Sequence, residues 1–159
     1  MKTGVRSEGA FPDVSLPDLE DEERPLADAW REGDALLLIG HRNCKTTRQT
    51  LPFVDRIHRR RGASHGVLAI LQDDKQTAVE LQDSLALALP MRLEADPYPL
   101  ARQLGLTTVP TLFLIDRAGE IRQVSEGFVK KDLESFAERL GVSAPLFTPE
   151  DKAPAMKPG

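Results

Sequence analysis

Cysteine and aromatic residues are scarce in this chain of 159 residues. The single cysteine, Cys44, cannot form an internal disulfide, which excludes the disulfide-stapled folds. Any disulfide chemistry must therefore be shared with a second molecule. Aromatic residues make up 5% of the chain, with one Trp and one Tyr, so aliphatic side chains must fill the core. A chain of this length can bury one core without covalent staples.

The sequence also lacks a surplus of positive charge and any long apolar run. Its formal net charge is −4, so no general positive field attracts nucleic acid or anionic lipid. The apolar run 35–39 is far too short to span a bilayer, and residues 1–9 hold no apolar signal segment. We expect a cytoplasmic protein with neither a nucleic-acid nor a membrane partner, although a removed signal or anchor would leave the same appearance.

Hydrophobic periodicity predicts strands and helices that alternate along the middle of the chain. Prolines at 12, 17 and 25 are typical of an edge strand or hairpin in the opening segment. The predicted order is then a helix over 25–33, a strand over 35–40, a helix from 44 to 61, a strand over 66–71, a helix over 73–89, a strand over 91–94, a helix over 97–105, a hairpin over 106–128 and a helix over 130–141. This order predicts an α/β fold with a mixed central sheet flanked by helices.

Three parts of the chain are expected to differ in how firmly they are folded. Residues 1–8 are predicted to be a flexible N-terminus, and residues 9–141 to form one domain. The proline-rich tail, residues 142–159, is expected to be loosely held.

Cys44 lies where a buried strand gives way to a helix, and Pro52 interrupts that helix eight residues later. A third feature is the segment Thr108-Val109-Pro110-Thr111 just before a strand. Together with the element order, these features resemble the thioredoxin superfamily over residues 9–141. Within it they resemble the redoxin branch, which includes thioredoxin-like disulfide reductases and peroxiredoxins of the alkyl hydroperoxide reductase type.

The resemblance implies a thioredoxin-like fold with an N-terminal hairpin extension and a strand-helix insertion in the middle. It also implies a cis bond between Val109 and Pro110, and a substrate groove formed by Val109, Pro110 and Thr111, with Arg42 nearby. The chain departs from the family pattern at two positions. Thr47 replaces the second cysteine of C-x-x-C, which excludes a dithiol cycle within the chain, and His41 replaces the threonine or serine of peroxiredoxins. Thr47 and Gln72 give a faint similarity to glutathione peroxidases.

The sequence offers two reasons why Cys44 would react as a thiolate. Unpaired amides and the positive dipole end of a helix that begins near residue 44 favour a negative sulfur. Nearby cationic side chains add to this effect: His41, Arg42, Lys45 and Arg48. We also expect the Thr47 hydroxyl to donate a hydrogen bond to the sulfur, and the sulfur itself to be exposed.

These features favour a single-cysteine thiol-disulfide oxidoreductase with antioxidant activity. Cys44 would form a mixed disulfide or reduce a peroxide, and thioredoxin or a low-molecular-weight thiol would then recycle it. The alternative is a non-catalytic module that binds a protein partner after loss of the second cysteine. An inert, buried cysteine is the ordinary interpretation of a lone thiol. The sequence indicates no cofactor and no metal site.

Overall fold

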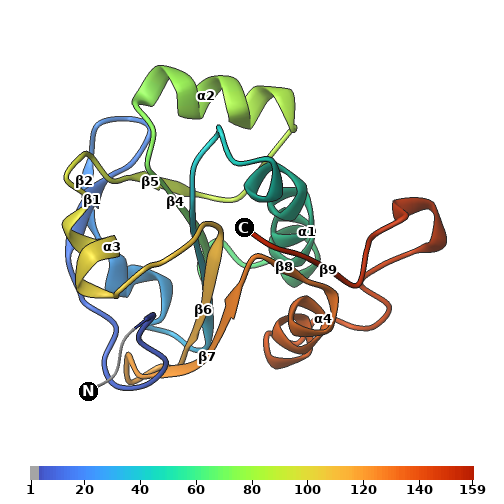
Figure 1. Ribbon diagram of the computed structural model, residues 1–159. Coiled ribbons are helices and arrows are strands. Elements are labelled where there is room, and N and C mark those ends of the chain that lie inside the picture. The colour runs from blue at the N-terminus through green and yellow to red at the C-terminus, as the bar shows by residue number, and fades with distance from the viewer. Residues whose placement is uncertain (1–3) are drawn as a thin grey trace.

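The structure, a computed structural model, describes residues 4–159. The protein has a central five-stranded sheet of order β5-β4-β3-β6-β7 (Figure 1). β4 runs parallel to β3 and to β5, whereas β6 runs antiparallel to β3 and to β7. The predicted mixed sheet is thereby confirmed. The strands are β3 (Ala35–Gly40), β4 (Val67–Leu71), β5 (Met91–Leu93), β6 (Thr111–Ile115) and β7 (Ile121–Glu126).

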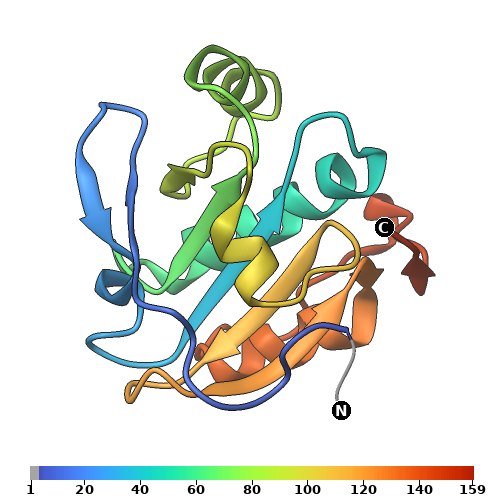
Figure 2. The same cartoon turned by 60° about the vertical axis from the view of Figure 1, so that its left-hand side comes forward.

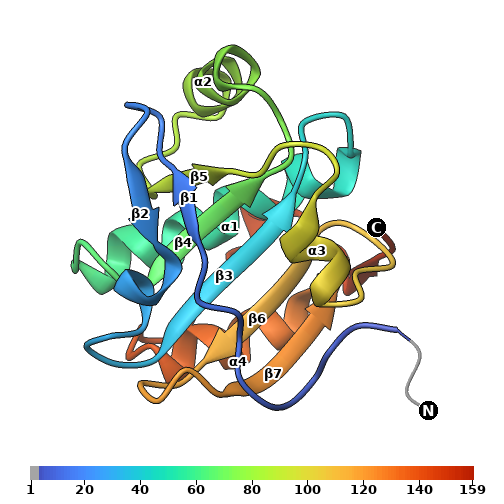
Figure 3. The ribbon, with the colours of Figure 1, turned by 90° about the vertical axis from the view of Figure 1, so that its left-hand side faces the viewer.

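Helices cover both faces of this sheet, which is why β3, β4 and β6 are buried along their whole lengths. Leu36 and Leu38 belong to a core cluster with residues of α1, α2 and α4, while Leu37 and Ile39 belong to one that includes α3. In Figure 3, α3 lies in front of the sheet and α1 and α4 lie behind it. The helices are α1 (Lys45–Arg61), α2 (Lys75–Ser84), α3 (Pro99–Gln103) and α4 (Lys130–Arg139). Within residues 4–159, no helix combines the length and hydropathy that crossing a membrane requires.

The predicted N-terminal hairpin is confirmed as a separate sheet of β1 (Ser15–Pro17) and β2 (Glu23–Pro25). It lies to one side of the central sheet (Figure 2). The helix expected over 25–33 is only one 3₁₀ turn, η1 (Leu26–Ala29). Of the predicted flexible N-terminus, residues 1–3 lie outside the described residues, and the Arg6 amide donates to the Leu104 carbonyl at 2.7 Å.

Helix α2 ends five residues earlier than its sequence predicts. Ala86 adopts a left-handed conformation (φ 52°), and the Leu87 amide turns back to the Gln82 carbonyl at 3.0 Å. This is the geometry of a Schellman helix end. The buried Asp55 carboxylate on α1 then accepts the amides of residues 88 and 89, both at 2.8 Å. Because these amides bond to Asp55, the chain leaves the helix before the apolar pattern ends.

The expectation that the tail is loosely held is wrong, because several side chains fix it to the domain. Phe147 is buried, and its ring centroid lies 4.7 Å from that of Phe53 and 6.0 Å from that of Phe128. Asp151 accepts two hydrogen bonds from the Arg56 guanidinium, at 2.7 and 3.0 Å, and this pairing lowers the pKa of the carboxyl below its usual value. The tail ends in β9 (Met156–Lys157), which pairs antiparallel with β8 (Phe128–Val129). The division into domains otherwise stays a prediction.

Phe147→Ala tests whether the tail contributes to the core. Removing this buried ring should lower the free energy of unfolding by about 3 kcal/mol, since it removes apolar contacts and leaves a cavity. Urea unfolding followed by the fluorescence of buried Trp30 measures the change. Met156→Ala, at a residue that is 61% exposed, is the matched control and should change stability by less than about 0.5 kcal/mol. Equal stability of Phe147→Ala and the wild type would contradict the packed tail.

Candidate active site around Cys44

Cys44 occupies the junction of β3 and α1, as its position in the sequence predicts. It is the N-cap residue of α1 and keeps an extended backbone (φ −87°, ψ 115°). Its carbonyl accepts the first helical hydrogen bond from the Arg48 amide at 3.2 Å. Its Sγ accepts the Thr47 amide at 3.4 Å, in the position that a serine or aspartate oxygen takes in an ordinary cap. The sulfur therefore lies at the positive end of a 17-residue helix.

A second contact joins the sulfur to the loop before β6. The Cys44 thiol donates to the Val109 carbonyl oxygen, with 3.3 Å between Sγ and O. The following Val109–Pro110 peptide bond is cis, so the bond that the resemblance implies lies beside the sulfur. The Val109 contact suits the protonated sulfur, whereas the Thr47 amide suits the thiolate. Because this loop lies against it, Cys44 is half-buried and not exposed as the sequence analysis expects.

Thr47 does not act through its hydroxyl. Its side chain is fully buried, and its Oγ1 has no hydrogen-bond partner among the described residues. The methyl and hydroxyl instead pack against Gly40, where a built Cβ would lie 2.7 Å from each. Gly40 thus leaves room for Thr47 beneath the first turn of α1. The backbone amide, and not the predicted hydroxyl, brings this residue to the sulfur.

The four predicted cationic side chains surround the junction, but within the described residues none forms a hydrogen bond to Sγ. The guanidinium of Arg42 lies 3.5 Å from the carboxylate of Glu80. The guanidinium of Arg48 donates to the carbonyl of Arg42, and Lys45 is exposed. Their effect on the sulfur is therefore a longer-range Coulomb interaction, weakened by solvent and salt.

Asp73 fixes the loop that leads from β3 to Cys44. Its carboxylate accepts the Arg42 amide at 2.9 Å. Partial burial raises the pKa of this carboxyl, and the same amide opposes the rise. The role of Asp73 could not be predicted from the sequence, because only the parallel pairing of β3 with β4 brings this residue to the loop.

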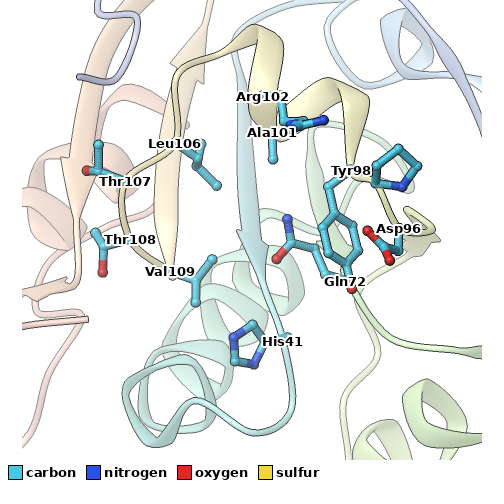
Figure 4. Close-up of a pocket in the computed structure, with 11 residues that line it drawn as sticks. His41, Gln72, Asp96, Tyr98, Ala101, Arg102, Leu106, Thr107, Thr108 and Val109 are labelled. Carbon is cyan, nitrogen blue, oxygen red and sulfur yellow. The ribbon is translucent and has the colours of Figure 1, made fainter. Parts of the chain in front are cut away.

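A cavity of about 500 Å³ opens beside the sulfur site (Figure 4). Two residues that bond to Cys44 line this cavity. The His41 carbonyl accepts the Cys44 amide, and the Val109 carbonyl accepts the Cys44 thiol. The cavity's other lining residues come from the end of β4, from α3 and from the loops on both sides of α3: Gln72, which follows β4, and Asp96, Pro97, Tyr98, Ala101, Arg102, Leu106, Thr107 and Thr108. Gln72 is among the residues singled out from the sequence, whereas Asp96, Tyr98 and Arg102 could not be predicted, because α3 reaches the cavity only through tertiary packing. Residues 4–159 hold no group of three or more His, Cys, Asp or Glu that could bind a metal ion.

Pro110 and Thr111, which the resemblance assigns to the substrate groove, mainly hold the loop before β6 in place. The Thr111 side chain is buried and donates to the Thr108 carbonyl at 2.8 Å. The carbonyl of Pro110 accepts the Gly127 amide at 2.8 Å. The first contact holds the loop in shape and the second ties it to the turn after β7. Of the three predicted groove residues, Val109 is the one that forms a hydrogen bond with the sulfur.

Comparison with known proteins agrees with this architecture. Residues 8–124 match the model of the AhpC/TSA family. The chain belongs to this family. The thiol-disulfide oxidoreductase ResA of Geobacillus kaustophilus (strain HTA426) is 28% identical over 144 residues, which cover 87% of this chain and 80% of that protein. Membership of the redoxin branch of the thioredoxin-like superfamily is thus confirmed.

Solved structures show the same fold at low identity. Peroxidoxin BcpB from Mycobacterium tuberculosis matches with a TM-score of 0.69 and 17% identity, over 89% of this chain and 97% of its own. A thiol-disulfide oxidoreductase from Bacteroides fragilis NCTC 9343 matches with a TM-score of 0.69 and 18% identity, over 80% of this chain and 98% of its own. At this identity the two similarities establish the fold alone.

Gly40→Ala tests the packing that supports the first turn of α1. The added methyl should meet the Thr47 side chain and destabilise the protein by about 1–3 kcal/mol. Thr47→Ala removes the two nearest atoms that it meets, so Gly40→Ala should destabilise the protein clearly less in that background. Urea unfolding of the two single variants and the double variant gives the coupling energy, which should exceed about 0.5 kcal/mol. If Gly40→Ala cost the same in both backgrounds, Thr47 would not be the residue that requires the glycine.

Proposed function

We propose that the protein is a single-cysteine thiol-disulfide oxidoreductase with Cys44 as its redox nucleophile. The observation that carries this proposal is the position of Sγ, which caps α1 and accepts the Thr47 amide. A helix N-terminus favours the thiolate, and the thiolate is the species that attacks disulfides. Family membership and the relative named thiol-disulfide oxidoreductase ResA support the same class of reaction.

In the proposed reaction, the Cys44 thiolate attacks one sulfur of a substrate disulfide. The substrate S–S bond breaks, a new S–S bond joins Cys44 to the substrate, and the departing sulfur takes up a proton. Because Thr47 replaces a resolving cysteine, release requires a second molecule. An external thiol, such as thioredoxin or a low-molecular-weight thiol, attacks the substrate sulfur of the mixed disulfide. Cys44 then leaves as the thiolate, and the external thiol remains bound to the substrate through a disulfide.

The residues around the sulfur take different parts in this scheme. The Thr47 amide stabilises the thiolate, and Val109 presents its carbonyl to the approaching substrate. Lys45 and His41 add positive charge near the site, the latter when protonated. Arg48 and Arg42 act on the loop before Cys44, since the Arg48 guanidinium donates to the Arg42 carbonyl.

Peroxide reduction is a second reaction open to the same thiolate. The thiolate would attack one peroxide oxygen, the O–O bond would break, and the other oxygen would leave with a proton. Two equivalents of external thiol would then return the sulfenic acid to the thiol. Membership of the AhpC/TSA family supports this reaction. Against it, His41 occupies the position where peroxiredoxins carry a threonine or serine. Disulfide exchange is therefore the favoured reaction.

A binding module without turnover is the contrasting function. Thr47 in place of a cysteine, together with the thiol donated to Val109, is the observation that favours it. Such a module would hold a partner in the same groove without forming a covalent bond. Covalent capture of a disulfide substrate distinguishes the two functions.

Native protein incubated with a small aromatic disulfide should release one equivalent of coloured thiolate and gain the mass of one mixed disulfide at Cys44. Cys44→Ser should release none. Addition of a low-molecular-weight thiol should restore the original mass. A wild-type thiol that stays unmodified until urea unfolds the chain would contradict the proposal and favour the binding module.

Hydrogen peroxide followed by a sulfenic-acid trap separates the two reactions of the thiolate. If disulfide exchange is the main reaction, one equivalent of peroxide should yield much less trapped adduct at Cys44 than the aromatic disulfide yields mixed disulfide in the same time. Mass measurement of both products on one protein sample gives the comparison. Faster formation of the sulfenic adduct would assign the site to peroxide reduction instead.

A further inference from the structure

Residues 155–159, which we call the strap, lie across the site in an extended conformation. Met156 and Lys157 form β9 against β8, and the Lys130 amide donates to the Ala155 carbonyl at 3.0 Å. The chain then continues toward the loop before β6, where Figures 1 and 3 both place its end. The last part of the tail therefore leaves the core cluster that holds Phe147 and runs toward Cys44.

The strap reaches the residues on both sides of the sulfur. Thr46, two residues after Cys44, donates its hydroxyl to the Pro158 carbonyl at 2.7 Å. Gly159 lies so near the loop that a built Cβ would stand 2.2 Å from the Val109 carbonyl oxygen and 2.3 Å from Thr108 Oγ1. That carbonyl oxygen is the one that accepts the Cys44 thiol. The strap thus reaches the group that faces the sulfur.

A third contact shows that the strap is fitted to its groove. Gly127, at the turn between β7 and β8, has a left-handed conformation (φ 77°), and a built Cβ would lie 2.5 Å from the Lys157 carbonyl oxygen. The groove is therefore bounded by the start of α1, the loop before β6 and this turn. These contacts use the backbone of the strap and the absence of side chains at 127 and 159. Such contacts suit an extended polypeptide whose sequence can vary except at the position that faces Val109.

We infer that the strap is an internal occupant of the polypeptide groove beside Cys44, and that a protein substrate must displace it to reach the sulfur. This inference rests on the proposed function and adds its substrate class: an extended polypeptide segment that carries a disulfide. The substrate pairs antiparallel with β8 and places a small residue against Val109. Because the strap belongs to the same chain, it competes at a high effective concentration.

The strap is held more weakly than the tail segment that precedes it. All five of its residues are exposed, and Met156 keeps 61% of its surface in contact with solvent. The preceding segment is fixed by buried Phe147 and by the paired hydrogen bonds between Arg56 and Asp151. The strap can therefore leave the groove while residues 142–151 stay packed.

Two variants remove the strap from the groove in different ways. One is a chain that ends at Pro154, and the other is Gly159→Val, whose side chain would collide with the Val109 carbonyl. The matched control is Met156→Ala, which alters the exposed side chain and leaves the backbone contacts unchanged. Circular dichroism and urea unfolding check that each variant keeps its fold.

The probe is a ten-residue synthetic peptide whose central cysteine is blocked as a mixed disulfide with a coloured aromatic thiol. Release of that thiol by Cys44 should be about tenfold faster or more for both strap variants than for the wild type and Met156→Ala, because an occupied groove lowers the fraction of competent protein. Adding the free peptide Ala-Pro-Ala-Met-Lys-Pro-Gly, the sequence of 153–159, should slow the chain that ends at Pro154 back toward the wild-type rate.

Failure of the inference can be told apart from failure of the proposed function. Equal probe rates in the wild type and both strap variants would overturn the strap and leave the thiol chemistry intact. If no form reacts with the probe while folded, the proposed function fails. Calorimetry then measures whether the free strap peptide binds to a chain that ends at Pro154 and carries Cys44→Ser. This experiment tests whether the groove binds the strap, and it requires no reaction of the sulfur. Saturable binding supports the strap, and its absence overturns it.

Discussion

The hydrogen bond from the Thr47 amide to Cys44 Sγ is the interaction on which the site depends. It exists because α1 begins at Lys45 and leaves its first amides without helical partners. Gly40 allows Thr47 to pack beneath this turn, and Asp73 fixes the loop before Cys44 through the Arg42 amide. The sheet and the helix thus converge on one sulfur atom.

The Val109 carbonyl faces that sulfur, and two features meet the loop that carries it. One is the cavity of about 500 Å³, lined by His41, Gln72 and residues of α3. The other is the groove that the strap fills, bounded by Thr46 and Gly127. In the proposed reaction, Cys44 needs one partner to oxidise it and another to release it, and both must approach the sulfur beside Val109.

Local patterns are enough to predict β3 and the start of α1, because each depends on neighbouring residues, whereas the cis bond at Pro110 follows only from the family resemblance. The end of α2 could not be predicted, since Asp55 on another helix binds the amides that follow it. The tail depends in the same way on Phe53, Phe128 and Arg56, which are distant in sequence. The role of Thr47 was assigned to the wrong group, because only the structure shows its hydroxyl turned toward Gly40.

The rate of alkylation of Cys44 by iodoacetamide at pH 7, compared between the native chain and the same chain unfolded in urea, tests the central claim most directly. If the start of α1 stabilises the thiolate, the native protein should react faster than the unfolded one, although its sulfur is half-buried. A native rate far below the unfolded rate would show that the fold protects this thiol and does not activate it.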